Sequence, residues 1–461
     1  MKRVFAQRTF GLGFLVALFL AACGGGAPAG GGGPIFGNPR LFLIGNNGTS
    51  GPELFATDGT FAGTVLVKDI NPGAASSFVQ NFTAVGDTHF FSAADSVNGQ
   101  ELWKTDGTPG GTVMVKNINS AGSSNPRFLV AVGSTLFFAA NNGSNGTELW
   151  KSNGTVAGTV MVRDIVAGVV GSAPESLTAV GATLYFAAND GVNGKELWKS
   201  DGTAAGTMIV RDINTTAGVG SNPAFLTAVG ATLFFQACDA MNGCELWKSD
   251  GTSGGTVLVK DIVAGAAGSA PESLTAVGAT LYFVANAGVN GKELWKSDGT
   301  AAGTVMLTAG VGSNPAFLTA VGTTLFFQAC DAMNGCELWK SDGTSGGTVL
   351  VRDINTTSGA SSNPANLTAV GTTLYFSAFT SASGTELWKS DGTSGGTVMV
   401  MDINPGPTGS NPSNLTAFDN MLFFTANDGV LWKSDGTAAR TAMVRDLNPV
   451  GGNGVTAILG P

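Results

Sequence analysis

The sequence predicts an all-β protein, a β-propeller of about nine four-stranded antiparallel blades. Three observations support this fold class. A segment of 44 to 49 residues recurs nine times, each copy contains four short runs rich in β-branched and aromatic residues, and short connectors with Gly, Asp and Asn separate the runs. Such runs are typical of antiparallel strands joined by hairpins, and four strands per roughly 48 residues is the size of a propeller blade.

Composition agrees with a folded, turn-rich chain. There are 69 Gly and 17 Pro among 461 residues, but 43% of the chain is hydrophobic, and 28 Phe with 8 Trp supply core material. Glycine suits tight turns and weakens helix interiors. The net charge of −9 disfavours nucleic acid as a partner. The single histidine, His89, excludes a metal site built from several histidines.

Residues 1–22 are predicted to be a lipoprotein signal peptide. Three basic residues precede an apolar run over 10–22, which is too short to span a bilayer but fits the hydrophobic region of a secretory signal. The run ends in Leu20-Ala21-Ala22-Cys23, which resembles the bacterial lipobox. This resemblance implies cleavage before Cys23 and acylation of that residue. An ordinary signal peptide followed by an incidental cysteine is the alternative.

Residues 23–40 are predicted to comprise the lipidated Cys23 and a Gly-rich tether, because 24–33 has the composition of a flexible linker. Lipid chains partition into a membrane at about 0.8 kcal/mol per buried methylene, so an acylated Cys23 would anchor the chain. Gly24, rather than Asp, follows this cysteine, which by analogy with enteric lipoproteins favours the outer membrane. The sequence therefore predicts an exported protein that is lipid-anchored to the cell envelope, with the periplasmic or surface face left open.

Residues 41–461 are predicted to form the repeat propeller domain. One full unit, 221–262, contains the runs FLTAV, TLFFQA, ELWKS and TVLVKDI in that order. A tripeptide, usually Asp-Gly-Thr, follows the third run at successive spacings of 48, 47, 48, 49, 48, 44, 49 and 44 residues. The first residues of this tripeptide are Asp58, Asp106, Asn153, Asp201, Asp250, Asp298, Asp342, Asp391 and Asp435.

The two ends of the repeat domain predict a closed ring. The first unit begins at Leu41 without a preceding FLTAV-type run, and the chain ends with such a run over 455–459. The C-terminal run can therefore pair with the first unit and complete one blade from both termini, which leaves no large exposed sheet edge. Two smaller rings and an open β-solenoid are the alternatives.

The repeats resemble the bacterial family named for its ELWxxDGT signature, sometimes described as hyalin-like. Eight of the nine units carry Leu-Trp before the tripeptide, and the first carries Leu54-Phe55. The resemblance covers essentially all of 41–450. It implies a secreted or surface-attached β-propeller-like protein and no particular biochemical role.

All eight tryptophans occupy one slot of the unit. We expect each to be a wedge between neighbouring blades, with its indole N–H bonded to a backbone acceptor. A ring of stacking sites for sugars is the alternative. The tryptophans are Trp103, Trp150, Trp198, Trp247, Trp295, Trp339, Trp388 and Trp432.

The Asp of the tripeptide is expected to accept backbone N–H groups and fix an Asx-type turn, a role that Asn153 can also fill. Calcium binding is the alternative. It is disfavoured because one or two carboxylates per unit fall short of the six to eight oxygen ligands that Ca²⁺ takes. The segment 189–194 (NDGVNG) comes nearest to a calcium loop. No metal and no cofactor is expected.

Two further charged positions recur. The fourth run brings a base beside an acid, as in Lys68-Asp69 and Arg211-Asp212, for which we expect pairing between blades; a ring of charge along the channel is the alternative. A glutamate precedes Leu-Trp in seven units and Leu-Phe in the first, and these eight glutamates form no distinct pair of the kind that glycoside hydrolysis requires. They are Glu53, Glu101, Glu148, Glu196, Glu245, Glu293, Glu337 and Glu386.

Four cysteines lie in two copies of CDAMNGC, where each pair flanks a hairpin loop. The other units have a cysteine at neither of the two positions, so the cysteines occur only as a pair. We therefore predict the disulfides Cys238–Cys244 and Cys330–Cys336, which fit an exported compartment. A redox or metal role is disfavoured. The segment 222–259 recurs at 314–351 with the single change of Ala231 to Thr323, which suggests a recent duplication.

The sequence predicts a non-enzymatic interaction or adhesion module on the envelope, because no nucleophile–base pair, metal cluster or phosphate loop interrupts the periodicity. A structural scaffold and a carbohydrate-active or other extracytoplasmic enzyme that uses the channel are the alternatives. The partner, a protein or a glycan, is left open. Any binding site is expected on loops of one rim that differ between units. The most variable connectors are Val166–Ser176, Asn214–Ser221, Val263–Ser269, Thr356–Pro364 and Phe379–Gly384.

Overall fold

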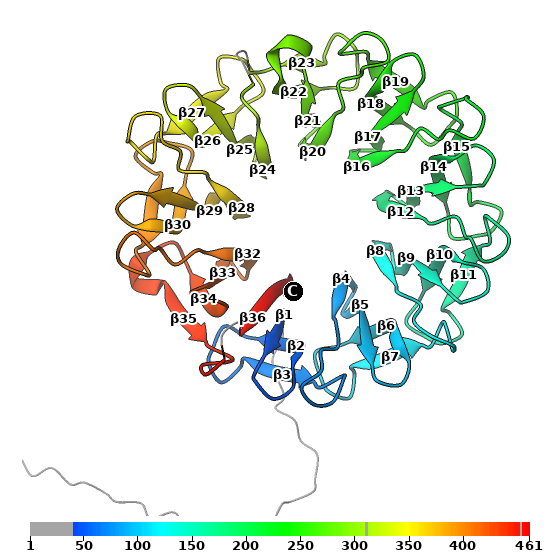
Figure 1. Cartoon of the computed structure of the whole chain (residues 1–461), viewed down its shortest axis with the longest axis horizontal. Coiled ribbons are helices and arrows are strands. Elements are labelled where there is room, and N and C mark those ends of the chain that lie inside the picture. The colour runs from blue at the N-terminus through cyan, green and yellow to red at the C-terminus, as the bar shows by residue number, and fades with distance from the viewer. Residues whose placement is uncertain (1–39, 309–311, 452–453) are drawn as a thin grey trace, which may run out of the picture. The chain divides into compact units, whose positions relative to one another are not determined.

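The computed structural model describes residues 40–308, 312–451 and 454–461. These residues form nine four-stranded antiparallel sheets arranged as blades around a central channel (Figure 1), so the predicted nine-bladed propeller is confirmed. The predicted signal peptide, Cys23 and nearly all of the tether lie outside the described residues. Among the residues that are described, no helix is long and apolar enough to cross a membrane.

In blades 2 to 9 the four strands follow one another in chain order outward from the channel, from the FLTAV-type strand to the outermost strand (Figure 1). Blade 1 consists of β36 (Val455–Gly460), β1 (Leu41–Asn46), β2 (Pro52–Thr57) and β3 (Val65–Lys68). Blades 2 and 3 consist of β4 (Gln80–Val85), β5 (Thr88–Asp95), β6 (Gly99–Thr105), β7 (Val113–Lys116), β8 (Arg127–Val132), β9 (Thr135–Asn141), β10 (Thr147–Ser152) and β11 (Val160–Arg163).

The next three blades keep this order. Blade 4 consists of β12 (Glu175–Val180), β13 (Thr183–Asn189), β14 (Lys195–Ser200) and β15 (Met208–Arg211). Blade 5 consists of β16 (Ala224–Val229), β17 (Thr232–Asp239), β18 (Gly243–Ser249) and β19 (Val257–Lys260). Blade 6 consists of β20 (Glu272–Val277), β21 (Thr280–Asn286), β22 (Lys292–Ser297) and β23 (Val305–Met306), with the short 3-10 helix η1 (Gly288–Asn290) in its hairpin.

The last three blades complete the ring. Blade 7 consists of β24 (Ala316–Val321), β25 (Thr324–Asp331), β26 (Gly335–Ser341) and β27 (Val349–Arg352). Blade 8 consists of β28 (Ala365–Val370), β29 (Thr373–Thr380), β30 (Gly384–Ser390) and β31 (Val398–Met401). Blade 9 consists of β32 (Ser413–Phe418), β33 (Met421–Ala426), β34 (Val430–Ser434) and β35 (Ala442–Arg445), with η2 (Ala438–Arg440) before its last strand.

The ring closes as predicted, through a blade built from both ends of the domain. Strand β36 pairs antiparallel with β1, with Leu43 opposite Ile458 and Ile44 opposite Ala457. Between blade 9 and blade 1, the Lys433 ammonium donates to the Gly59 carbonyl, with 2.7 Å between Nζ and O. One ring therefore holds all nine blades, and the open solenoid and the pair of smaller rings are wrong.

The core lies between consecutive blades. In one cluster, Tyr185 and Leu197 of blade 4 pack against Leu233, Phe235 and Trp247 of blade 5. The same arrangement recurs around the ring, because the alternation of each middle strand presents apolar side chains to both neighbouring blades. The repeated hydrophobic slots are thus accounted for by packing.

Candidate functional site

The Asp-Gly-Thr tripeptide forms the predicted Asx-type turn. The Asp201 Oδ1 atom accepts the Thr203 N–H at 2.8 Å and the Thr203 hydroxyl at 2.7 Å, and these hydrogen bonds hold the pKa of Asp201 below its usual value. Asn153 accepts the same two groups, at 3.1 and 2.8 Å. The Gly that follows has a left-handed φ, 87° at Gly202, so this position favours glycine. The role of the tripeptide is to hold the turn.

The segment nearest to a calcium loop is held by its own hydrogen bonds. Asp190 accepts the N–H groups of Val192 and Asn193 at 2.9 and 2.7 Å, and the Asn193 side-chain amide at 2.7 Å. Within the described ranges, no group of three or more His, Cys, Asp or Glu side chains could hold a metal ion. These oxygens are therefore used for the turn.

The recurring glutamates are fully buried and join consecutive blades. Glu196 accepts the Ser221 N–H at 2.7 Å, the Ser221 hydroxyl at 2.6 Å and the Ile213 N–H at 3.1 Å. Ser221 leads into the inner strand of the next blade. Burial raises the pKa of Glu196 although these hydrogen bonds oppose it, and burial raises the pKa of Glu53 to about 7. We call each such contact a Glu–Ser latch.

Serine hydroxyls complete the latch at seven of the blade junctions that the described residues form. The pairs are Glu101–Ser124, Glu148–Ser172, Glu196–Ser221, Glu245–Ser269, Glu293–Ser313, Glu337–Ser362 and Glu386–Ser410. Blade 9 has Val430 in the glutamate slot. These carboxylates serve assembly of the ring and do not converge on one another as a catalytic pair.

The tryptophans pack between blades as expected, but the predicted hydrogen bonds of their indole N–H groups are not formed. Each of the eight Nε1 atoms is buried, and none has a hydrogen-bond partner among the described residues. The expected backbone acceptor is therefore wrong. The reason is the surroundings of the ring: Trp247, for example, lies among apolar side chains that include Val210 and Ile213 of the preceding blade.

The bases of the fourth run reach the next blade, but not to an acid. Arg211 donates to the Thr256 carbonyl at 2.6 Å, and its guanidinium carbon lies 5.9 Å from the centre of the Trp247 ring. Lys68 contacts Thr112 and Trp103 in the same way. The strands that carry these bases are the outermost of each blade (Figure 1), so the alternative of a charged ring along the channel is wrong.

Both predicted disulfides form. Cys238 lies directly opposite Cys244 on β17 and β18, and Cys330 lies opposite Cys336 on β25 and β26. Each crosslinks the two strands that flank a hairpin loop, with six residues of separation. Their place in a regular hairpin indicates a structural role.

The repeats differ most informatively at one slot near the channel. In blades 2 to 9, the second residue of the inner strand lies at an interruption of the strand register and has φ of 51–57°. We call this position the mouth slot, because the inner strands border the channel (Figure 1). In chain order it holds Asn81, Phe128, Ser176, Phe225, Ser273, Phe317, Asn366 and Asn414.

Three mouth slots carry phenylalanine, in the alternate blades 3, 5 and 7. Phe128, Phe225 and Phe317 are 40%, 48% and 51% exposed. A left-handed backbone costs a bulky L-residue roughly 1–2 kcal/mol, and exposure of an aromatic ring forgoes burial. Folding therefore gains little from these three rings, of which Phe225 and Phe317 are the two copies of one duplicated position.

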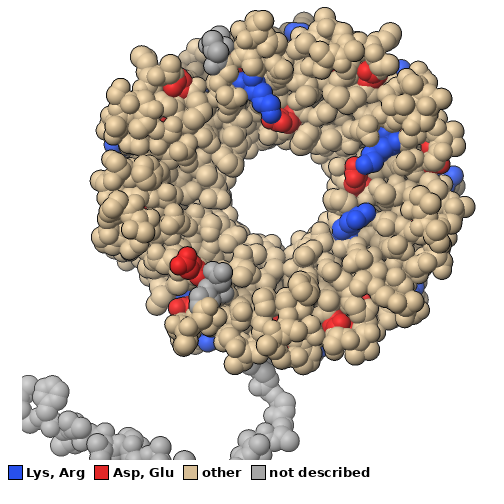
Figure 2. Space-filling view, viewed as in Figure 1, with Lys and Arg blue, Asp and Glu red and all other residues tan. Residues whose placement is uncertain are grey.

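The two intervening blades carry ion pairs beside serine at the mouth slot. Glu175 pairs with Lys195 at 2.7 Å in blade 4, and Glu272 pairs with Lys292 at 2.5 Å in blade 6. Figure 2 shows paired basic and acidic side chains beside the channel opening on one arc of this face and none on the opposite arc. We call the stretch from blade 3 to blade 7 the aromatic arc.

The opposite arc is built from amides that are bound within the ring, and those of Asn81 and Asn366 also donate to the Pro126 and Pro412 carbonyls ahead of the next blade. Asn81, Asn366 and Asn414 donate from Nδ2 to the side-chain oxygens of Ser92, Ser377 and Thr425, at 3.3, 3.1 and 3.0 Å. Asparagine also tolerates the left-handed backbone of the slot. The mouth of the channel therefore has two chemically different halves.

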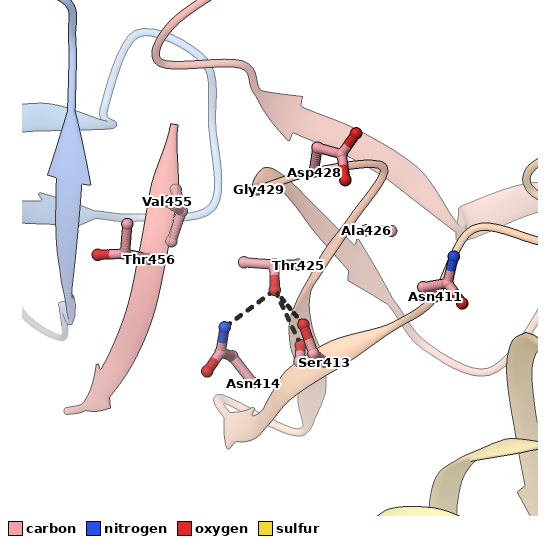
Figure 3. Close-up of a pocket in the computed structure, with 9 residues that line it drawn as sticks. All are labelled: Asn411, Ser413, Asn414, Thr425, Ala426, Asp428, Gly429, Val455 and Thr456. Atoms are coloured by element: carbon pink, nitrogen blue, oxygen red, sulfur yellow. Dashed lines mark hydrogen bonds between the residues drawn. The ribbon is translucent and has the colours of Figure 1, made fainter. Parts of the chain in front are cut away.

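A cavity of about 330 Å³ lies at the seam where blade 9 meets β36 (Figure 3). Among its polar side chains, Thr425 contacts both Ser413 and Asn414, and Asp428 is the one charged residue of the lining. It opens beside Gly429 and Val455, where the Glu–Ser latch is missing. The cavity follows from the way the ring closes and has no charged cluster that would select a ligand.

The aromatic arc was not predicted from the sequence. Of the five variable connectors, only Val166–Ser176 reaches a mouth slot, and the phenylalanines lie inside the regular FLTAV-type run. The available signal was the alternation of Phe, Ser and Asn at one slot of an otherwise apolar strand. Strand periodicity alone gives no sign that this slot is a bulge with positive φ.

Comparison with known proteins assigns the chain to no family. No family model matches the chain, and no curated protein matches it. Among solved structures, the chain is similar to the computationally designed Ika8 protein (15% identity, TM-score 0.44, 77% of this chain and 96% of that one) and to BamB from Moraxella catarrhalis (15%, 0.39, 76% and 92%).

A puromycin hydrolase is also similar, at 14% identity and a TM-score of 0.40, over 76% of this chain and 59% of that one. This chain thus spans less than two thirds of the hydrolase. At such identities and scores, the likenesses carry no argument about activity or partners.

Proposed function

We propose that this protein is a non-enzymatic interaction module of the cell envelope, which binds a protein or glycan partner with the aromatic arc of its channel mouth. The observation that carries the proposal is the set of three exposed phenylalanines, each on a left-handed backbone. Exposed aromatic rings rimmed by polar groups are typical of binding surfaces. The ion pairs of blades 4 and 6 supply that polar rim.

Anchorage and family are part of the same proposal. The lipobox-like Leu20-Ala21-Ala22-Cys23 supports a lipid anchor at the N-terminus, most simply in the outer membrane. The ELWxxDGT-like repeats support membership of the hyalin-like bacterial repeat family. An anchored propeller presents a rigid rim to other envelope components, which suits adhesion or scaffolding.

The test replaces Phe128, Phe225 and Phe317 together with serine, which is the chain's own residue at the mouth slots of blades 4 and 6. Binding of the full chain to a glycan array and to isolated cell envelopes is measured before and after the change. We expect the triple variant to lose at least tenfold in affinity and to stay folded. Thermal unfolding of the same samples checks the fold.

A matched control removes the same number of exposed apolar side chains from hairpin loops farther from the channel. Val97, Met241 and Val289 are 85%, 78% and 99% exposed, and their triple serine variant is expected to bind as the wild type does. Unchanged binding by the Phe variant would refute the aromatic arc as the binding surface. Turnover of a glycan during the assay would refute the non-enzymatic role and favour the enzyme alternative.

A further inference from the structure

Blade 6 departs from the repeat at its outer edge. Its outermost strand, β23, has two residues, whereas the outermost strand of every other blade has four. Thr308 aligns in sequence with the slot that holds Lys or Arg in seven units and Met401 in one, and its buried hydroxyl donates to the Glu293 carboxylate at 2.5 Å and accepts the Leu294 N–H at 2.9 Å. The chain from 309 to 311 lies outside the described residues.

At the regular junctions, the missing base has a defined binding mode. A cation lies 5.7–6.0 Å from the tryptophan ring of the next blade at five junctions, formed by Lys68, Lys116, Arg163, Arg211 and Lys260. Each of the five also donates to a threonine carbonyl of that blade. The ring face and the carbonyl together form a receptor for a cation.

The same receptor in blade 7 has no base from blade 6. Trp339 is only partly buried, whereas Trp247 is 5% exposed. A cavity of about 570 Å³ lies against it, lined among others by Leu307, Thr308, Asp331, Trp339, Ser345 and Thr348. Shortening of β23 and the Lys/Arg-to-Thr replacement therefore leave a space beside the tryptophan.

The blade 7 wall of this cavity has a sequence twin that shows its preferred contact. Segment 314–351 equals 222–259 except at Thr323, so Trp339 and Thr348 correspond to Trp247 and Thr256. At the twin, Arg211 stacks on the ring and binds the carbonyl. An identical wall selects the same chemical group, so the cavity is complementary to a cation on an aliphatic stem.

Charge in the cavity favours a cation as well. Asp331 lies in its wall, and its carboxylate accepts the N–H groups of Met333 and Asn334 and the Asn334 side-chain amide. Partial burial acts to raise the pKa of Asp331, but these hydrogen bonds outweigh it and hold the pKa below its usual value. The carboxylate is therefore negative at neutral pH, in a chain of net charge −9.

We propose that the cavity between blades 6 and 7 binds a guanidinium or ammonium group at the end of an aliphatic chain. The cation stacks on Trp339 and donates to the Thr348 carbonyl, with Asp331 nearby. An arginine or lysine side chain of a polypeptide and a small free alkyl cation share this chemistry. This site is separate from the aromatic arc and does not depend on the function proposed for it.

The test uses the full chain with 5-fluorotryptophan in its eight tryptophan positions, followed by ¹⁹F NMR. The probes are acetyl-Gly-Arg-Gly-amide, the same peptide with citrulline as a neutral isostere, and propylguanidinium. The resonance of Trp339, identified from its absence in Trp339→Phe, is expected to shift saturably with the arginine peptide and with propylguanidinium. The citrulline peptide is expected to cause no shift. The Trp247 resonance is the internal reference, because Arg211 already lies on that ring.

The three probes separate the two sources of the cation. Equal or tighter binding of the peptide supports a polypeptide side chain, and binding of propylguanidinium alone supports a small free cation. No saturable shift with either cation, or an equal shift with citrulline, would overturn the proposal.

A filled-cavity variant gives an independent test. Thr308→Arg restores the base of the other junctions and is expected to weaken binding of the arginine peptide at least tenfold. The control Val156→Arg adds the same charge on an exposed loop of blade 3 and is expected to leave affinity unchanged. The other seven tryptophan resonances report whether each variant is folded. Wild-type affinity in a folded Thr308→Arg variant would place the binding elsewhere and refute the cavity.

Discussion

Replacement of Glu196 by alanine tests the Glu–Ser latch as a source of stability. The change leaves four buried donors without their acceptor: the Ser221 N–H and hydroxyl and the N–H groups of Ile213 and Asn214, now at 2.7, 2.6, 3.1 and 3.4 Å from carboxylate oxygens. A buried donor without a partner costs about 1–3 kcal/mol. Relief of the buried negative charge, whose pKa is raised by burial, offsets part of this loss.

We therefore expect Glu196→Ala to lower the free energy of unfolding by about 3 kcal/mol, measured by urea unfolding with tryptophan fluorescence. The partner change Ser221→Ala and the double variant complete a mutant cycle. A latch predicts that the double variant loses clearly less than the sum of the single losses. Additive losses, or a loss below about 0.5 kcal/mol for Glu196→Ala, would refute the view that this contact joins the blades.

Three further outcomes follow from the structure. Burial raises the pKa of Glu53 to about 7 and also raises the pKa of Glu196 and of several other recurring glutamates, so the folded state binds more protons than the unfolded state between about pH 4.5 and 7. The urea midpoint should therefore fall as the pH rises through this window, and a rise would contradict this expectation. Phe225→Ser should change stability by less than about 1 kcal/mol, because the half-exposed ring contributes little packing, whereas Phe235→Ala in the core should cost about 3–5 kcal/mol; equal losses in urea unfolding would contradict the view that folding gains little from the Phe225 ring. The double change Cys238→Asn with Cys244→Lys, which reproduces the residues of blade 4, should cost about 2 kcal/mol in the same assay, and an unchanged midpoint would show that the crosslink adds nothing.

The fold was predictable because it depends on what repeats. Strand order, blade number and closure follow from the spacing of Asp-Gly-Thr and from the unpaired run at 455–459, and the structure confirms each. The turn role of Asp201 was predictable for the same reason, since an Asx-type turn depends on neighbours in the sequence.

The candidate sites depend on departures from the repeat, whose consequences are set by three-dimensional context. Phe225 has the pattern of a strand residue, and only the positive φ of the bulge turns its ring into exposed surface. The effect of Thr308 depends on the neighbouring blade, because at other junctions the base aligned with Thr308 contacts the tryptophan of the next blade, which here is Trp339. One sequence contains these substitutions but gives no measure of the space that they open.

The closing junction supplies an internal control for the latch. There, Val430 replaces the glutamate, and Gly454 occupies the serine position, since Asn46 donates to its carbonyl just as Cys238 donates to that of Ser221. Glutamate and serine are thus lost together, as expected if neither is useful without the other: a lone buried carboxylate would lack its donor, and a lone hydroxyl its acceptor. The junction is held instead by the pairing of β36 with β1 and by the Lys433 contact to Gly59. The paired loss indicates that the recurring glutamates belong to blade assembly, which leaves the unpaired departures, at the mouth slots and at Thr308, as the positions on which the two binding proposals rest.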